Sequence, residues 1–271
     1  MTRDRLINGT MMMALAVFGV LNSWAFIAIV LALTAGGLYE FLTLIKEKGI
    51  PIYSYTGIII GLLIPLSIFV RFELTKNWEL LFIVLALLII FLMQFMRREI
   101  NNAIVGISGT LFAVLYVAWF FSFLIKIRYL LPGIEGVKLL AFILLVTKVG
   151  DVGALLIGSK FGKHLLIPRV SPHKTIEGSL GSFVFSGITA ILAKSLFPAA
   201  LNFSMGEMFW IGLIFGGIGQ LGDLSESLLK RDCNVKHSGR LLGGLGGILD
   251  SIDSLLFTAP AFYFYMSSLL L

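Results

Sequence analysis

Five acidic residues lie within or at the ends of long apolar stretches, where carboxylates are rarely found. They are Asp151, Asp223, Glu226, Asp250 and Asp253. An ionised carboxylate in a membrane interior costs several kcal/mol unless it is paired, hydrated or bound to a cation, so such side chains usually face a cavity or a partner. We therefore expect these five carboxylates to face a polar cavity or a partner rather than lipid.

Two sets of polar residues have the spacing of a single helix face. The first set is Asp223, Glu226, Ser227 and Lys230, and the second is Asp250, Asp253 and Ser254. Two helices can thus present carboxylates to a shared cavity, which suits a hard cation such as Mg²⁺, because this ion takes oxygen ligands and bridges to phosphates. The group of Asp223, Asp250 and Asp253 lacks enough nearby cations for neutralisation, so it needs a metal ion or protons.

Two other charged positions have simpler explanations. Lys148 precedes Asp151 by three residues inside one apolar stretch. This spacing favours an ion pair, which either positions the span or belongs to a catalytic site, and the sequence leaves both readings open. Glu40 lies near the end of another apolar stretch with Lys46 and Lys48 close by, so we expect a solvated helix end there.

Two polar connections, residues 159–176 and 231–245, are rich in basic residues and glycines. In the first, Ser171 or Thr175 can cap the helix that follows, and Lys174 beside that helix N-terminus would suit a phosphate. In the second, Lys230 and Arg231 lead into a glycine-rich turn that allows close backbone approach to a ligand. Carboxylates for a metal, with cations and glycines for phosphates, indicate phosphoryl or nucleotidyl transfer on a lipid.

The composition indicates that membrane-spanning helices position these residues. Hydrophobic residues make up 58% of the chain and charged residues 13%, against about 25% charged in soluble domains. Helices are expected because they satisfy their own backbone polar groups in lipid. We predict an all-α, polytopic membrane protein with about nine spans. The predicted spans are 7–22, 24–45, 53–71, 78–96, 102–126, 137–158, 177–197, 206–230 and 246–269.

The distribution of lysine and arginine predicts the orientation. Of the 21 basic residues, 14 lie on the side of the N-terminus, six on the opposite side and one, Lys148, inside a span. The positive-inside rule makes the first side cytoplasmic, so both polar connections face the cytoplasm and the C-terminus faces outward. The basic, apolar N-terminal stretch lacks a clear cleavage site, so we expect a retained helix. Cys233 is the single cysteine, which excludes an intrachain disulfide.

The stretch SLLKRDCNVKHSGRLLGGLGGILDSID, residues 227–253, resembles the signature of the phosphatidate cytidylyltransferases, or CDP-diacylglycerol synthases. The matching residues are Ser227, Lys230, Arg231, Lys236, Gly239, Gly244, Gly246, Gly247, Asp250 and Asp253. The upstream SPHKTIEGSLG resembles a second family stretch, and the resemblance covers roughly the C-terminal half. Four positions depart from the family pattern: His237 stands for Asp, Gly243 for Pro, Leu245 for His and Ser251 for Arg.

The resemblance implies transfer of CMP from CTP to phosphatidate, giving CDP-diacylglycerol and pyrophosphate in phospholipid biosynthesis. It implies a nucleotidyltransferase with one or two Mg²⁺ ions held by Asp223, Asp250 and Asp253. The other catalytic residues it implies are Lys230, Arg231 and Lys236. The substrate-binding residues it implies are Ser171, Lys174, Thr175, Glu177, Ser227, Gly244, Gly246, Gly247 and Asp151.

The expected partners are CTP, phosphatidate and membrane lipids, with no nucleic acid and with a homodimer as one candidate assembly. The expected location is the cell (inner) membrane, with the N-terminus and the active site cytoplasmic. Residues 1–130 would form a scaffold or dimerisation part, and residues 131–271 would carry the catalytic site.

Two other functions remain open at this stage. A CTP-dependent lipid kinase, such as a polyprenol kinase, would transfer the γ-phosphoryl group instead of CMP. An ion- or proton-coupled transporter would use the intramembrane pair of Lys148 and Asp151. The chain shows no duplicated half with interrupted helices, which argues against the transporter.

Overall fold

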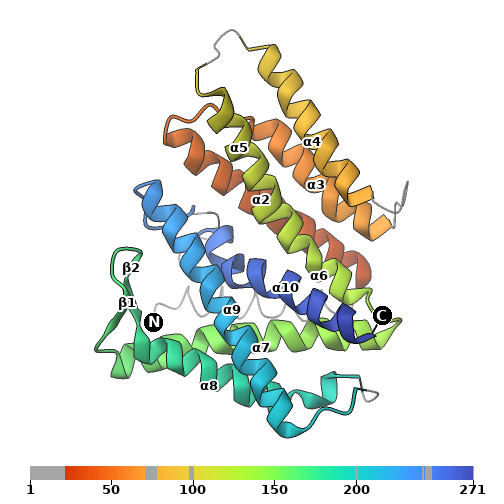
Figure 1. Cartoon of the computed structure of the whole chain (residues 1–271), viewed down its shortest axis with the longest axis vertical. Coiled ribbons are helices and arrows are strands. Elements are labelled where there is room, and N and C mark those ends of the chain that lie inside the picture. The colour runs from red at the N-terminus through yellow and green to blue at the C-terminus, as the bar shows by residue number, and fades with distance from the viewer. Residues whose placement is uncertain are drawn as a thin grey trace. The chain divides into compact units, whose positions relative to one another are not determined.

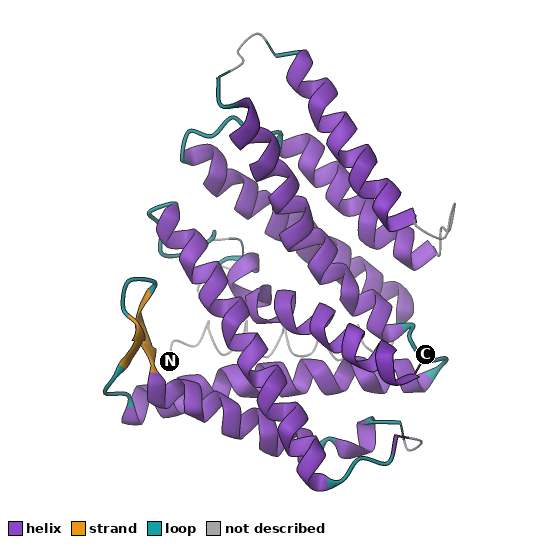
Figure 2. Ribbon diagram, in the orientation of Figure 1, coloured by secondary structure: helices purple, strands orange, loops and turns teal. Residues whose placement is uncertain are grey.

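The computed structural model describes residues 22–70, 78–97, 101–198, 201–239, 241 and 246–270. Helices dominate these ranges, as Figures 1 and 2 show. In chain order the elements are α2 (Ser23–Glu47), α3 (Ser54–Val70), α4 (Trp78–Phe95), α5 (Ala103–Ala113), the π-helix η1 (Val114–Trp119), α6 (Phe120–Arg128), α7 (Ile134–Phe161), β1 (Leu165–Ile167), β2 (Ser171–Thr175), α8 (Ile176–Leu192), the 3-10 helix η2 (Lys194–Leu196), α9 (Met205–Asp232) and α10 (Ile248–Leu270).

The helices confirm an all-α membrane protein but not the count of nine spans. Among the described residues, the helical segments that are long and apolar enough to cross a membrane are five: α2, α4, the continuous run from α5 to α6, α7 and α9. Helices α3 and α8 are apolar but shorter, and residues 7–21 of the predicted span 7–22 lie outside the described residues. Along α4 only Ala86 and Ile90 are buried, so most of its large apolar side chains are available to contact lipid.

Polar side chains at two helix starts explain where those helices begin. The Asn22 side chain accepts hydrogen bonds from the backbone N–H groups of Trp24 and Ala25, so α2 begins at the predicted break between the spans 7–22 and 24–45. The Thr175 hydroxyl accepts a hydrogen bond from Gly178 N at 3.1 Å, which confirms Thr175 as the cap of α8. The segment before α8 is not an irregular loop, because β1 and β2 pair there as an antiparallel hairpin.

The described chain divides into two compact units. The first comprises the helices up to Ile125 together with Cys233–Ser251, and the second comprises Lys126–Asp232 together with Ile252–Leu271. One boundary therefore falls inside α6 and another inside α10. The predicted division at residue 130 lies near the first of these boundaries, whereas the segment after α9 belongs with the N-terminal helices. The scaffold and catalytic roles assigned to the two parts stay predictions.

Each unit has an apolar core of its own. In the first unit, α3, α4, α5 and η1 contribute a buried cluster consisting of Tyr53, Ile60, Ile64, Ala86, Ile90, Ile107 and Val114. In the second unit, the Phe142 ring contacts those of Phe197 and Phe262, with centroids 4.5 and 5.8 Å away, and Phe215 packs on Phe262 at 5.2 Å. These rings join α7, α9 and α10, the helices that carry Asp151, Asp223, Glu226 and Asp253.

Candidate active site

A glycine lets α9 and α10 approach closely at the level of the acidic residues. A Cβ atom placed on Gly222 would lie 2.5 Å from the backbone oxygen of Asp253 and 3.2 Å from Ser254 Cα. No residue with a side chain fits there without displacing a helix backbone. Because Asp223 follows Gly222 directly, this close approach brings a carboxylate of α9 beside a carboxylate of α10.

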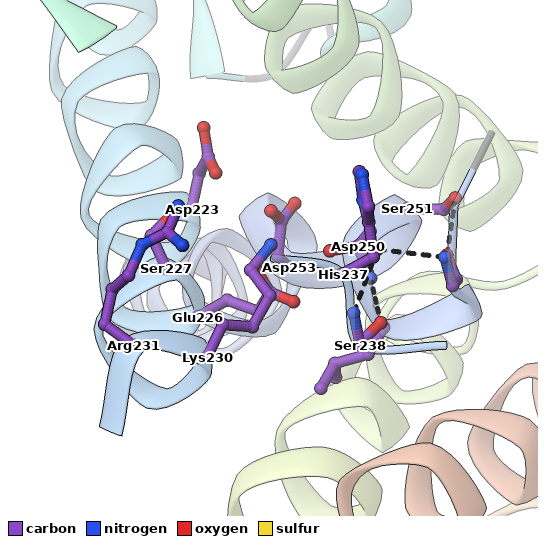
Figure 3. Close-up of polar contacts among 12 residues, drawn as sticks. Asp223, Glu226, Ser227, Lys230, Arg231, His237, Ser238, Asp250, Ser251 and Asp253 are labelled. Carbon is purple, nitrogen blue, oxygen red and sulfur yellow. Dashed lines mark hydrogen bonds and ion pairs between the residues drawn. The ribbon is translucent and has the colours of Figure 1, made fainter. Parts of the chain in front are cut away.

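Three carboxylates converge at this crossing. One side-chain oxygen each from Asp223, Glu226 and Asp253 lies within 4.8 Å of the other two, and no other group of three potential metal ligands occurs among the described residues. Glu226 and Asp253 are buried, and Asp223 is half-buried. Figure 3 shows Asp223 and Glu226 on α9 and Asp253 on α10. Three carboxylates so close together repel one another unless cations or protons are present, so their arrangement suits a hard cation.

Lysines from two different elements accompany the carboxylates. Lys174, in β2, places its Nζ atom 2.7 Å from Asp223 Oδ1 and 3.4 Å from Ser227 Oγ. Lys230, one helical turn after Glu226, forms an ion pair with it. The hairpin thus positions Lys174 next to the carboxylates, beside the N-terminus of α8. Both lysines can neutralise a carboxylate or a phosphate, since either anion satisfies an ammonium group.

A second charged pair lies on α7 and reaches α10. Lys148 Nζ lies 3.1 Å from Asp151 Oδ2 and 2.9 Å from Ser254 Oγ, and the Ser254 hydroxyl donates to Asp151 Oδ2 at 2.9 Å. The ion pair predicted from the spacing is therefore formed. Ser254 contacts both members of this ion pair and directly follows Asp253. The α7 pair therefore lies next to the carboxylate cluster within the same unit.

Asp250 takes part in a polar cluster in the first unit. Its Oδ2 atom accepts hydrogen bonds from Gly247 N at 2.9 Å and Ser238 N at 3.2 Å, and His237 Nδ1 lies 3.6 Å away. Figure 3 shows Ser238 and His237 beside Asp250. The segment between α9 and α10 therefore folds back onto the first turn of α10. Asp250 as a metal ligand stays a prediction.

The remaining predicted residues of the basic connections have varied surroundings. Glu177 accepts hydrogen bonds from the backbone N–H groups of Lys163 and His164 at 3.1 and 3.2 Å, and its Oε1 lies 2.6 Å from His164 Nδ1. Glu177 thus connects the first turn of α8 to the residues just before β1. Arg231 Nε donates to Val170 O at 3.2 Å.

For the other predicted positions the structure gives burial or backbone conformation, and some of them lie outside the described residues. Ser171 is buried and Lys236 is exposed. Gly246 has a positive φ of 93°, a backbone conformation that favours glycine. Gly244 lies outside the described residues, as do Gly243 and Leu245. Ser251, the remaining departure from the family pattern, donates a hydrogen bond to Gly247 O at 3.3 Å.

Two acidic residues differ in the structure from what the sequence suggested. Glu226 was not among the predicted metal ligands, although its spacing from Asp223 already placed it on the same helix face. Glu40 was expected at a solvated helix end, and this prediction is wrong, because only 3% of Glu40 is exposed. Its Oε2 atom accepts hydrogen bonds from Ser238 Oγ and Leu249 N, contacts between residues about 200 positions apart that no local pattern indicates.

Comparison with known sequences gives the class of this multi-pass membrane protein. A sequence profile described as the cytidylyltransferase family matches residues 3–269, so the chain belongs to this family. The resemblance inferred from the signature residues is thereby confirmed.

Two of three similar proteins carry the name phosphatidate cytidylyltransferase. The chain is 31% identical over 270 residues to the phosphatidate cytidylyltransferase of Bacillus subtilis, covering 98% of this chain and 97% of that protein. It is 41% identical over 150 residues to the phosphatidate cytidylyltransferase of Staphylococcus aureus, covering 55% of each. It is 38% identical over 162 residues to the uncharacterized protein YnbB of Escherichia coli, covering 58% of this chain and 50% of that protein. The last two alignments span about half the length of those relatives.

Proposed function

We propose that this protein transfers CMP from CTP to phosphatidate, releasing pyrophosphate and forming CDP-diacylglycerol. The observation that carries the proposal is the convergence of Asp223, Glu226 and Asp253 within 4.8 Å in a chain of the cytidylyltransferase family. In this reaction an oxygen of the lipid phosphate attacks the α-phosphorus of CTP. A new P–O bond forms, and the bond between the α-phosphorus and the oxygen that bridges to the β-phosphate breaks.

The reaction needs charge neutralisation more than it needs a base. The lipid phosphate is already an anion at neutral pH, so no strong general base has to remove a proton from it. The difficulty is to bring two anions together in line, which cations and positioned lysines overcome. Lys174 and Lys230 would bind the triphosphate or the lipid phosphate, because each already holds its ammonium group against a carboxylate at the site.

The donor set fits Mg²⁺. Asp223, Glu226 and Asp253 would hold the ion, since hard cations prefer carboxylate oxygens and no thiolate or imidazole belongs to this cluster. A bound Mg²⁺ ion would neutralise charge on the phosphates. Asp250, one helical turn before Asp253 on α10, stays a predicted additional ligand.

The orientation follows from the charge distribution. We propose that the protein lies in the cell (inner) membrane, with the basic hairpin and the polar segment after α9 on the cytoplasmic side. The predicted topology puts most basic residues on this side of the membrane. CTP and phosphatidate would then meet at the cytoplasmic ends of α9 and α10. A homodimer remains a prediction.

Labelled CTP tests the proposal directly. Purified protein in detergent or nanodiscs is incubated with phosphatidate, Mg²⁺ and CTP labelled at either the α- or the γ-phosphorus. We expect the α-label to appear in the lipid product and the γ-label only in pyrophosphate. Transfer of the γ-label to a lipid would indicate a kinase and contradict the proposal.

A pair of variants connects the activity to the site. Asp253→Asn keeps the shape of the side chain but removes its charge, so we expect at least a hundredfold loss of α-label transfer, the scale seen when transition-state charge stabilisation is removed. Asp232→Asn is the matched control, because Asp232 is exposed at the end of α9. Equal rates for the two variants would show that the carboxylate cluster is not the active site.

A further inference from the structure

Glu40 is a buried carboxylate on α2 that the proposed reaction does not use. Its Oε2 atom accepts hydrogen bonds from Ser238 Oγ at 3.1 Å and from Leu249 N at 3.0 Å. Its other oxygen, Oε1, has no hydrogen-bond partner among the described residues. A buried acid with so specific a set of donors costs free energy, so its contacts call for an explanation.

Glycines of the segment between α9 and α10 leave room for this carboxylate. A Cβ atom on Gly239 would lie 2.2 Å from Glu40 Oε1, and one on Gly247 would lie 2.5 Å from Glu40 Oε2. One turn earlier on α2, a Cβ atom on Gly36 would lie 2.2 Å from Ile248 Cδ1. The start of α10 therefore packs along one face of α2. The Glu40 carboxylate lies against Gly239, and it lies against Gly247 together with the Ser238 hydroxyl.

The same contacts lead from Glu40 to Asp250 through one serine. The Ser238 hydroxyl donates to Glu40 Oε2 and accepts a hydrogen bond from Asp250 N at 3.3 Å, while Ser238 N donates to Asp250 Oδ2 at 3.2 Å. Gly247 N completes the pair of backbone donors to Asp250 Oδ2. Glu40 thus fixes the position of Ser238, and Ser238 contacts both the backbone and the carboxylate of Asp250.

The Glu40 carboxylate lies beside the N-terminus of α10, which adds an electrostatic reason for its position. The first N–H groups of a helix lack partners within the helix and carry partial positive charge. Glu40 accepts from one of them, at Leu249, and Asp250 accepts from Gly247 just before α10. Protein carboxylates satisfy these donors, so the N-terminus of α10 is held on α2.

We propose that Glu40 is a positioning residue: through Ser238 and Leu249 it holds the first turn of α10, and with it the Asp250 carboxylate, in the orientation used for catalysis. This role rests on the proposed function, in which Asp250 is a predicted metal ligand. It assigns the N-terminal helices a part in the reaction, because α2 supplies the residue that fixes Asp250.

Hydrogen exchange tests the structural step without relying on activity. Glu40→Ala, Glu40→Gln and the control Glu47→Ala are compared in detergent by mass spectrometry. Glu47 is the last residue of α2 and is exposed. Because a hydrogen bond to a charged group contributes about a factor of ten or more in equilibrium, we expect at least about tenfold faster exchange at residues 247–250 in Glu40→Ala. Glu40→Gln keeps an acceptor oxygen, so it should exchange at an intermediate rate.

The Mg²⁺ dependence of CMP transfer tests the functional step. We expect the half-saturating Mg²⁺ concentration to rise about tenfold in Glu40→Ala and to stay unchanged in Glu47→Ala. A general loss of folded protein would lower the maximal rate without moving this concentration. Should Glu40→Ala not accumulate, Glu40→Gln carries both measurements.

The outcomes separate this role from the proposed function. Exchange at residues 247–250 that equals that of the parent protein would overturn the role of Glu40, even with ordinary CMP transfer. An unchanged Mg²⁺ half-saturation in the variants would likewise overturn it. A parent protein that transfers no CMP would refute the proposed function, while the exchange comparison would still decide whether Glu40 holds the turn.

Discussion

Replacing Gly222 with alanine should separate the two helices that carry the carboxylates. The added methyl group would lie 2.5 Å from the backbone oxygen of Asp253, whereas ordinary contact between non-bonded heavy atoms begins near about 3.5 Å. The neighbour is helix backbone rather than the end of a flexible side chain, so it cannot rotate away. The helices must therefore move apart by roughly 1 Å.

This displacement is large for a catalytic site and modest for stability. A misplacement of about 1 Å can lower a rate by about 100-fold, because reacting groups lose their alignment. Overpacking a core typically costs about 1–3 kcal/mol, which lowers the melting temperature without preventing folding. We expect Gly222→Ala to lower kcat for CMP transfer about 100-fold and to raise the Mg²⁺ concentration needed for half-maximal rate.

The assay combines initial rates with α-labelled CTP and thermal unfolding of the same preparations. Gly206→Ala is the matched control, because a Cβ atom on Gly206 would meet only Ser204 Oγ, at 3.9 Å. Both changes replace glycine by alanine in α9, which by itself favours the helix by about 1 kcal/mol. Only Gly222→Ala should therefore lose activity.

Two results would refute this reasoning. If Gly222→Ala keeps the parent rate and Mg²⁺ dependence, the close approach of α9 and α10 does not position the reacting groups. If Gly206→Ala loses as much activity as Gly222→Ala, helix flexibility rather than helix separation explains the effect.

Three further variants test other parts of the site. Glu226→Gln should raise the half-saturating Mg²⁺ concentration about tenfold, and an unchanged value in a Mg²⁺ titration would exclude Glu226 as a ligand. Lys148→Met should lower stability by about 1 kcal/mol or more because Asp151 loses its partner, and adding Asp151→Asn should recover part of that loss in thermal unfolding; a fully additive loss would contradict their coupling. Thr175→Val should cost about 1 kcal/mol by removing the cap of α8, and an unchanged melting temperature would show that the cap does not stabilise the helix.

Local patterns predicted much of the fold and part of the site. Helices occupy the positions of eight predicted spans, from 24–45 to 246–269, because long apolar runs in lipid have few alternatives to helix. Thr175 was predicted as a cap of the helix that follows, with Ser171 as the alternative. Asp223 and Asp253 were predicted together because each stands where a carboxylate is costly.

Contacts between distant segments could not be predicted from the sequence. The burial of Glu40 depends on a segment about 200 residues later, whose glycines fit around its carboxylate. The hairpin of β1 and β2 was also missed, since strands of three and five residues leave almost no periodic signal. The spacing of Glu226 already placed it on the Asp223 face, but it was not included among the predicted metal ligands.

In the proposed function, the pairing of lysines with carboxylates would let one site accommodate both a cation and a nucleotide. Lys174 and Lys230 each neutralise one of three clustered carboxylates in the structure. A triphosphate that draws these lysines to its own oxygens leaves the carboxylates uncompensated, and a buried uncompensated charge is costly. In the proposed function, a divalent cation held by these carboxylates would remove that cost. Each ligand would then make the site more favourable for the other.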